Sequence, residues 1–272
     1  MPEPHLDFAP SSTARIPYES VGEGTAVVFI HAGIADHRMW DPQFADVPEG
    51  FRFVRLDLRG YGECEVGDSP FSNHEDVIAV LDHLGVDRAV AVGCSMGGGT
   101  AFDVALAAPD RVMGLVLIGS GSPGFEPEEY EPPQWKEAVA SFERGDLARV
   151  AELDAEMWVI GYGRALEDVD RKVFDLVIEM DRAPLSTETR RDELTVALDP
   201  PRAGRMGEIS VPVLVMVGEH DLPDVREAAD HVARTLSHHE AVVIPGAAHL
   251  PSLEQPEMFN RVLTGFLYGF SV

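Results

Sequence analysis

Short apolar runs alternate with helical stretches along most of the chain. Uninterrupted apolar runs are typical of strands buried on both faces of a parallel sheet. Such runs predict strands at 26–30, 51–58, 89–92, 112–118, 213–217 and 241–244. One helix is predicted at 73–84, with Gly85 ending it, and a second follows the strand 89–92 and its turn. Two more are predicted at 222–236 and 254–267. The alternation predicts an α/β fold with a mostly parallel sheet flanked by helices on both faces.

The amino-terminal segment follows a different pattern. Residues before about Thr13 are polar and interrupted by prolines, so we expect an ordered or frayed arm there. Residues 15–20 can form an edge strand, and a glycine-containing turn follows at 21–25.

The strand–helix alternation stops between about residues 122 and 210. This stretch is first acidic and rich in proline and then carries two amphipathic stripes, the first ending at Met157 and Trp158 and the second running from Val169 to Met180, with Pro184 as a break. We interpret it as an inserted helical cap, which divides the chain into a core at 1–121, a cap at 122–210 and a second core part at 211–272. The apolar stripes can serve as contacts with the core, or Trp158, Met157 and Trp135 can wall a substrate pocket.

Composition and charge exclude some classes of binding partner. The chain has 272 residues with 47 acidic and 21 basic side chains, a formal charge of -26, which argues against nucleic acid or an anionic membrane as a partner. The first 16 residues do not resemble a signal peptide and no stretch reaches about 20 apolar residues. We therefore expect a cytoplasmic protein, monomer or homodimer, that acts on a small molecule away from any membrane.

Cofactor and metal motifs are missing from the sequence. Residues 119–124 match G-x-G-x-x-G after a strand, but prolines and acidic residues follow instead of a helix. The loop is more typical of a hinge into the cap. No zinc-ligand spacing or phosphate-binding loop is present, so the sequence predicts neither a cofactor nor a metal.

A sharp turn around Ser95 carries the clearest chemical signal. Gly93 and Gly97 flank Ser95 in the pattern G-x-S-x-G, between an apolar strand and an alanine-rich helix. Lifting a serine hydroxyl clear of a strand end requires a strained backbone with no Cβ atom two residues before or after it. The pattern in this setting predicts that Ser95 is a nucleophile.

A serine nucleophile needs a base and an acid that orients the base. His249 lies in a loop beyond the last predicted strand, and Asp221 follows the strand 213–217. Because carboxyl ends of parallel strands share one edge of a sheet, both can reach Ser95. Glu219 and Asp224 are local alternatives to Asp221.

The oxyanion formed during acyl transfer needs two hydrogen-bond donors. We expect the backbone N–H groups of Met96 and Gly33, with Ile34 as the alternative to Gly33. His31 is expected to hold this loop through its side chain. Ile34 and Leu250 are also assigned to the substrate pocket.

These motifs together resemble the α/β-hydrolase superfamily. They stand in its order, namely HAG at 31–33, DLRGYG at 57–62, GCSMGG at 93–98, GEHD at 218–221, and His249. The likeness covers nearly the whole chain and points to the capped esterase, lactonase and C–C hydrolase branch. The segment 158–161 is similar to cofactor-free hydrolases related to enol-lactonases. Ala32 replaces the usual glycine, and Cys64 stands where many relatives carry a small hydroxyl residue.

The sequence thus predicts a serine hydrolase for small to medium, mainly apolar carboxylic esters or lactones. A C–C bond hydrolase or a perhydrolase on the same triad is an alternative, and the former would need a pocket arginine such as Arg164, Arg182 or Arg190. A hydrolase-fold ligand receptor with little turnover is a third possibility. The serine nucleophile disfavours the dehalogenase and epoxide-hydrolase branches, which use aspartate.

Overall fold

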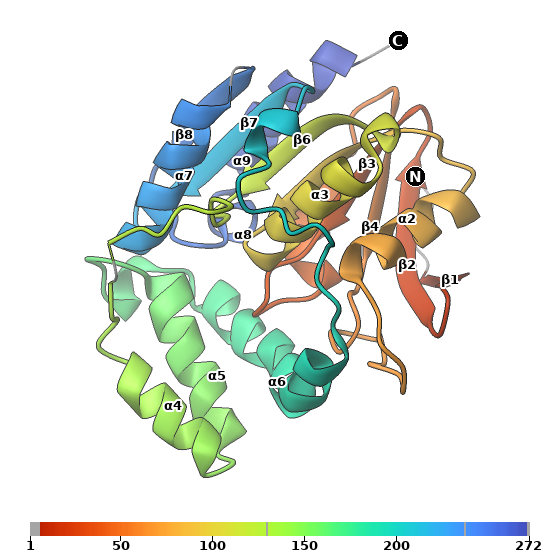
Figure 1. Ribbon diagram of the computed structural model, residues 1–272. Coiled ribbons are helices and arrows are strands. Elements are labelled where there is room, and N and C mark those ends of the chain that lie inside the picture. The colour runs from red at the N-terminus through yellow and green to blue at the C-terminus, as the bar shows by residue number, and fades with distance from the viewer. Residues whose placement is uncertain (1–5, 129, 237, 271–272) are drawn as a thin grey trace.

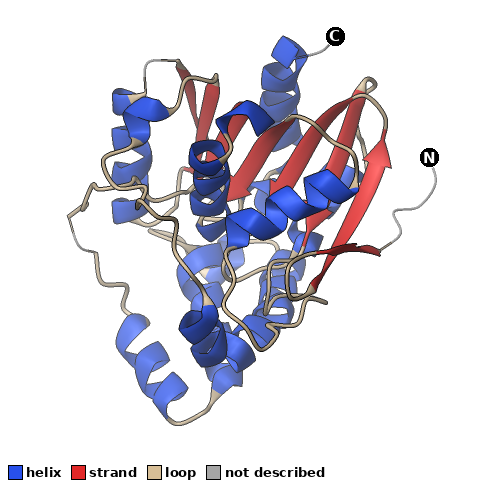
Figure 2. Ribbon diagram, turned by 45° about the vertical axis from the view of Figure 1, so that its right-hand side comes forward, coloured by secondary structure: helices blue, strands red, loops and turns tan. Residues whose placement is uncertain are grey.

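The centre of the protein is a twisted sheet with helices on both faces (Figures 1 and 2). The computed structural model describes residues 6–128, 130–236 and 238–270. Within these ranges eight strands form one sheet in the order β1-β2-β4-β3-β5-β6-β7-β8. β1 and β2 pair antiparallel, as do β2 and β4, and every later pair is parallel. The strands are β1 (Asp7–Pro10), β2 (Arg15–Gly22), β3 (Thr25–Ile30), β4 (Phe51–Leu56), β5 (Ala89–Cys94), β6 (Val112–Ile118), β7 (Val213–Gly218) and β8 (His239–Ile244).

Alternate strand residues feed two apolar layers, one on each face of the sheet. In β3, Val28 and Ile30 join one cluster and Val27 and Phe29 join the other. The six residues of β5 are all buried, as expected of a central parallel strand. The helices of the core are α1 (Asp41–Phe44), α2 (Asn73–His83), α3 (Met96–Ala107), α7 (Pro223–Thr235), α8 (Pro251–Glu254) and α9 (Pro256–Leu267).

Further helices between β6 and β7 gather below the sheet in Figure 1. They are α4 (Trp135–Glu143), α5 (Leu147–Ala155), the π-helical turn η3 (Glu156–Ile160) and α6 (Arg171–Leu194). Val159, Val177 and Met180 pack into the apolar cluster of the α9 face, so the stripes of this segment do contact the core. This arrangement fits the cap interpretation, while the boundaries at 122 and 210 stay a prediction. The helices in the described ranges are all too short or too polar to cross a bilayer.

Several boundaries differ from the sequence prediction. The predicted arm contains β1, because its backbone from Asp7 to Pro10 pairs with β2. The helix predicted at 254–267 is α9, which starts two residues later at Pro256, and the short helix α8 before it was not predicted. Pro184 does not end its helix but lies inside α6, where the next turn is held to the core by the Thr187 hydroxyl donating to the Gly60 carbonyl at 3.1 Å.

Candidate active site

Ser95 occupies the tight turn between β5 and α3. Its φ of 53° makes it the one non-glycine residue with positive φ in the part of the chain that the structure describes. Such a conformation costs about 1–3 kcal/mol and persists only where the surroundings enforce it. The turn presents the half-buried Ser95 at the carboxyl edge of the sheet, as the sequence motif predicts.

Close backbone contacts enforce this turn. A Cβ atom on Gly93 would collide with the carbonyl group of Gly97. A Cβ atom on Gly97 would collide with the carbonyl oxygens of Ile30 and His31 at the end of β3. Glycine at both positions is therefore a requirement of packing, as expected.

His249 and Asp221 form a buried pair at the same edge. The Nδ1 atom of His249 lies 2.9 Å from Oδ2 and 3.0 Å from Oδ1 of Asp221, and the two residues are 3 % and 1 % exposed. Glu219 instead accepts the backbone N–H of Gly246 at 3.0 Å. Of Asp221, Glu219 and Asp224, it is Asp221 that has a hydrogen bond to the His249 ring.

The charge around His249 favours its protonated form. Burial alone would lower the pKa of His249, but the carboxylate and hydrogen bond of Asp221, with smaller contributions from Glu254 and Asp224, raise it above its ordinary value. Because Asp221 engages Nδ1, the Nε2 atom is left to accept a proton.

Short contacts bring the His249 loop to the serine turn. The thiol of Cys94, next to Ser95, donates to the His249 carbonyl at 3.5 Å, and the Ser95 N–H donates to Ile118 of β6 at 2.8 Å. Gly119 lies against both members of the acid–base pair, since a Cβ atom there would lie 3.0 Å from Asp221 Oδ2 and 3.1 Å from His249 Nδ1. Within the described ranges the Ser95 hydroxyl makes no hydrogen bond to His249.

The two expected oxyanion donors lie beside each other. A Cβ atom on Gly33 would be 3.8 Å from Met96 Cβ, which puts the loop after β3 against the start of α3. The Tyr61 hydroxyl packs on the same spot, 3.2 Å from Met96 Sδ.

His31 holds this loop, as predicted. Its Nδ1 lies 2.8 Å from the Ala32 carbonyl and its Nε2 accepts the Leu58 N–H at 3.0 Å. Burial lowers the pKa of His31, consistent with a neutral ring that donates at one nitrogen and accepts at the other.

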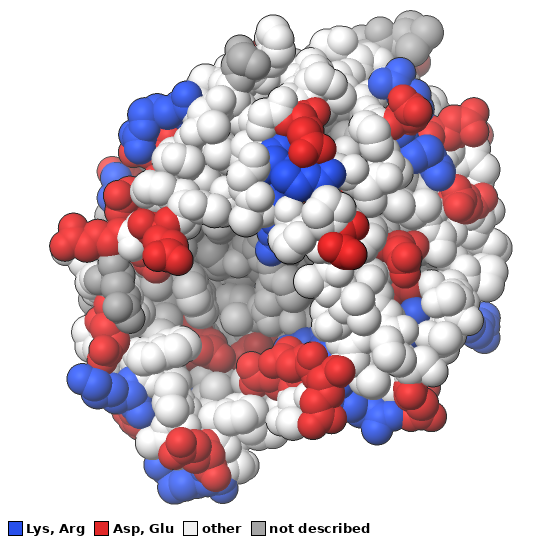
Figure 3. All heavy atoms as spheres, in the orientation of Figure 1, with Lys and Arg blue, Asp and Glu red and all other residues white. Residues whose placement is uncertain are grey.

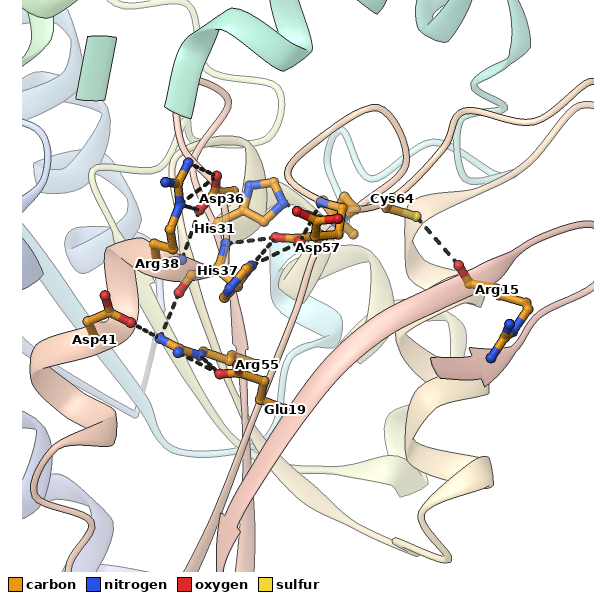
Figure 4. A network of polar contacts seen from close by, with 12 residues as sticks. Arg15, Glu19, His31, Asp36, His37, Arg38, Asp41, Arg55, Asp57 and Cys64 are labelled. Atoms are coloured by element: carbon orange, nitrogen blue, oxygen red, sulfur yellow. Dashed lines mark hydrogen bonds and ion pairs between the residues drawn. The ribbon is translucent and has the colours of Figure 1, made fainter. Parts of the chain in front are cut away.

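A polar network lies next to His31 (Figure 4). The Asp57 carboxylate accepts from the His37 N–H at 2.8 Å, from His37 Nδ1 at 2.9 Å and from the Glu63 N–H at 3.0 Å. Ligand atoms of Asp36, His37 and Asp57 lie within 4.8 Å of one another. Asp36 is paired with Arg38 at 2.8 Å, so this cluster is satisfied by its own donors and acts as a brace for the loop.

A cavity of about 700 Å³ contains Ser95 and Met96. Its walls come from α3, the first turn of α2, the loop 121–124 and the segments 195–198 and 201–203. The charged or titratable side chains on these walls are His74, Asp103 and Arg202. Figure 3 shows a deep hollow in this face of the molecule, with acidic side chains along its lower rim.

The five residues predicted to line the substrate pocket do not lie together in the structure. The Trp158 ring lies 4.5 Å from the His249 ring, and the Trp158 carbonyl accepts the His249 N–H at 3.1 Å. Met157 is buried with Ala138 of α4 and Leu153 of α5. The remaining three lie elsewhere, with Ile34 half-buried and packed against the core, Leu250 fully buried and Trp135 49 % exposed. Of these five residues, Trp158 is the one whose ring packs on the His249 ring, and none of the five lines the Ser95 cavity.

Sequence reasoning missed the wall formed by the loop 121–124 and by 195–203. The glycine-rich run 119–124 carried a signal, but a hinge explained it equally well. The arginine on the wall is Arg202, held by Asp103 Oδ2 at 2.7 Å. Arg164 is instead buried against Glu254, while Arg190 pairs with Asp68 at the surface and Arg182 is exposed.

Known proteins of similar sequence and structure are hydrolases. The chain is 24 % identical to 3-oxoadipate enol-lactonase 1 of Acinetobacter baylyi over 89 % of this chain and 88 % of the relative. It is 28 % identical to the pimeloyl-[acyl-carrier protein] methyl ester esterase of Yersinia enterocolitica over 90 % and 94 %. A thermophilic esterase from Thermogutta terrifontis superposes with a TM-score of 0.79 at 25 % identity, and the match covers 98 % of this chain and 100 % of that one.

One protein-family model matches most of the chain. The model of the alpha/beta hydrolase fold family matches residues 25–256, which include the strained serine turn, the His249–Asp221 pair and the segment between β6 and β7. The sheet is mostly parallel, as this fold requires, and the similar proteins are hydrolases. Because the family model matches most of the chain, the protein belongs to the α/β-hydrolase fold family and is a hydrolase.

Proposed function

We propose that the protein hydrolyses small to medium, mainly apolar carboxylic esters or lactones through an acyl-enzyme on Ser95, His249 and Asp221. The observation that carries this proposal is the buried His249–Asp221 pair at the sheet edge where the strained Ser95 is exposed to a cavity. The esterase and lactonase relatives support the substrate class.

Each residue has a defined role in this reaction. His249 Nε2 takes the proton of the Ser95 hydroxyl as Oγ attacks the carbonyl carbon, and Asp221 stabilises the resulting imidazolium. The N–H groups of Met96 and Gly33 hold the oxyanion. When the carbonyl re-forms, the C–O bond breaks and the leaving alkoxide takes the proton from His249. Water, activated by the same nitrogen, then releases the acid and restores Ser95.

The proposal is tested by labelling with a fluorophosphonate and by turnover of a panel of esters and lactones. Wild type should be labelled at Ser95 and should hydrolyse p-nitrophenyl esters, while Ser95→Ala should lose both properties. Labelling at another residue, or equal turnover by Ser95→Ala, would contradict the assignment. Absence of turnover despite labelling would instead favour a ligand receptor on the same fold.

A second candidate is C–C bond hydrolysis of a diketone-like acid. One observation favours it, namely that Arg202 lines the Ser95 cavity and could pair with a substrate carboxylate. Comparing turnover of such an acid with that of simple esters, in wild type and in Arg202→Gln, separates the two reactions.

A further inference from the structure

Ser122 lies on the wall of the cavity that contains Ser95. It belongs to the loop that leaves β6, in the glycine-rich run that the reaction described above does not use. The residue is only 7 % exposed, so most of its surface is packed against protein and the remainder faces the cavity that it lines.

His231 and Phe125 fix the orientation of Ser122. The Ser122 Oγ atom lies 2.7 Å from Nδ1 of His231 in α7. The His231 ring stacks on Phe125 with 4.0 Å between centroids and 9° between planes, and the Phe125 N–H donates to the Ser122 carbonyl at 3.1 Å. The three residues form a closed unit, so the hydroxyl has little freedom to turn.

The contact with His231 determines whether the Ser122 hydroxyl offers a ligand its proton or its lone pairs. The hydroxyl has one proton, which can go to Nδ1 of His231 or to the thioether of Met206, a weak acceptor 3.8 Å from Oγ. In the tautomer of His231 that carries its proton on Nε2, Nδ1 accepts the Ser122 proton and Oγ keeps its lone pairs. In that tautomer no N–H or O–H group within the described ranges of the chain donates to Oγ, and a part-buried acceptor without a donor discriminates strongly among ligands.

We propose that Ser122, positioned by His231, binds a hydrogen-bond donor of the substrate, such as a hydroxyl or amide N–H in the part beyond the scissile carbonyl. The proposal rests on the proposed role of Ser95, because both residues line the same cavity. It narrows the substrate class from apolar esters and lactones to those with a donor group on an otherwise apolar skeleton.

A matched series of esters tests the proposal. p-Nitrophenyl hexanoate is compared with the same ester carrying a hydroxyl at carbon 2, 3 or 6, since the position that reaches Ser122 depends on how the chain lies. Wild type should favour one hydroxylated ester over the plain one by about tenfold in kcat/KM, mostly through KM, which corresponds to one hydrogen bond.

Variants at the two positions separate recognition from packing. Ser122→Ala should bring the ratio of hydroxylated to plain ester close to one, and Ser122→Thr should restore part of it. His231→Phe keeps an aromatic ring for the stack on Phe125 but removes the acceptor, so the ratio should fall as the Ser122 hydroxyl turns. Ser186→Ala, at an exposed serine of α6, should keep the wild-type ratio.

The failure of this proposal differs from the failure of the proposed function. If Ser95 is labelled and esters are hydrolysed but no hydroxyl position is favoured, or the preference survives in Ser122→Ala, only the role of Ser122 is overturned. If Ser95 is neither labelled nor needed for turnover, the proposed function itself fails. Thermal unfolding of each variant identifies any that is not folded.

Discussion

At the scale of single residues, the site depends on two side chains that no local pattern links. Asp221 and His249 are 28 positions apart, yet their side chains meet at 2.9 Å inside the protein. The pair sets the tautomer of the imidazole and raises its pKa, so it should control both the rate and its dependence on pH.

Replacing Asp221 by Asn should reveal both effects. Without the carboxylate, the ring loses its fixed tautomer and kcat should fall by about 10³–10⁴-fold. The base must be unprotonated to act, and the pKa of His249 lies above its ordinary value, so wild-type kcat/KM should reach half its maximum above about pH 6.5. In Asp221→Asn the carboxylate charge is gone, and this acid limb should move to lower pH.

The control for this experiment is Glu219→Gln, in the same short segment. Glu219 accepts a backbone N–H and does not touch His249, so the variant should keep the wild-type limb. An acid limb that stays in place in Asp221→Asn would show that His249 is not the group whose titration limits the reaction.

At the scale of elements, α5 and α6 face each other through the half-buried Asp154 and the buried Asp181. Burial and the facing carboxyl of Asp154 raise the pKa of Asp181, which is 2 % exposed and has an Oδ2 atom without a hydrogen-bond partner. Burial likewise raises the pKa of Asp154. A carboxyl with a raised pKa in the folded state holds its proton there longer than in the unfolded chain. Stability is therefore lost as pH rises above about 4, the ordinary value for aspartate.

Asp181→Asn should remove this loss, because a neutral amide can donate to Asp154 at any pH. The variant should be more stable than wild type at pH 8, and the difference in unfolding free energy should shrink towards pH 5. Urea unfolding at a series of pH values measures it. Asp175→Asn, at an exposed acid of the same helix, should give no such trend, and a trend of equal size there would refute the assignment to Asp181 and Asp154.

The sequence predicts elements with a local signature and misses those that depend on tertiary contacts. The strand–turn–helix around Ser95 is local and was predicted correctly, because glycine spacing and apolar runs report on backbone geometry. β1 was missed, since a four-residue edge strand with two prolines nearby has no local signature and forms only by pairing with β2. Pro184 was misjudged because a tertiary contact, Thr187 with Gly60, holds the helix beyond it. The Ser122–His231 pair joins residues 109 positions apart, and no spacing in the sequence indicates it.

At the scale of the whole molecule, charge is the dominant unexplained feature. The 26 excess acids cannot all be paired, and the buried ion pairs, such as Arg59 with Asp76 and Arg164 with Glu254, use only a few of the arginines. Unpaired like charges on one surface repel one another more in the compact state than in the expanded chain. The net charge is thus expected to lower the stability of the fold at low ionic strength.

Salt should therefore stabilise this protein. The Debye length falls from about 30 Å at 0.01 M to about 8 Å at 0.15 M, so repulsion across the surface is screened in this range. The same salt weakens exposed ion pairs, but these contribute only about 0–1 kcal/mol each and are fewer than the excess acids. Tm at pH 7.5 should rise by several degrees between 0.01 and 0.3 M NaCl and then level off. A rise that continues linearly to 2 M would indicate salt exclusion from apolar surface instead, and a fall in Tm would mean that the ion pairs outweigh the repulsion.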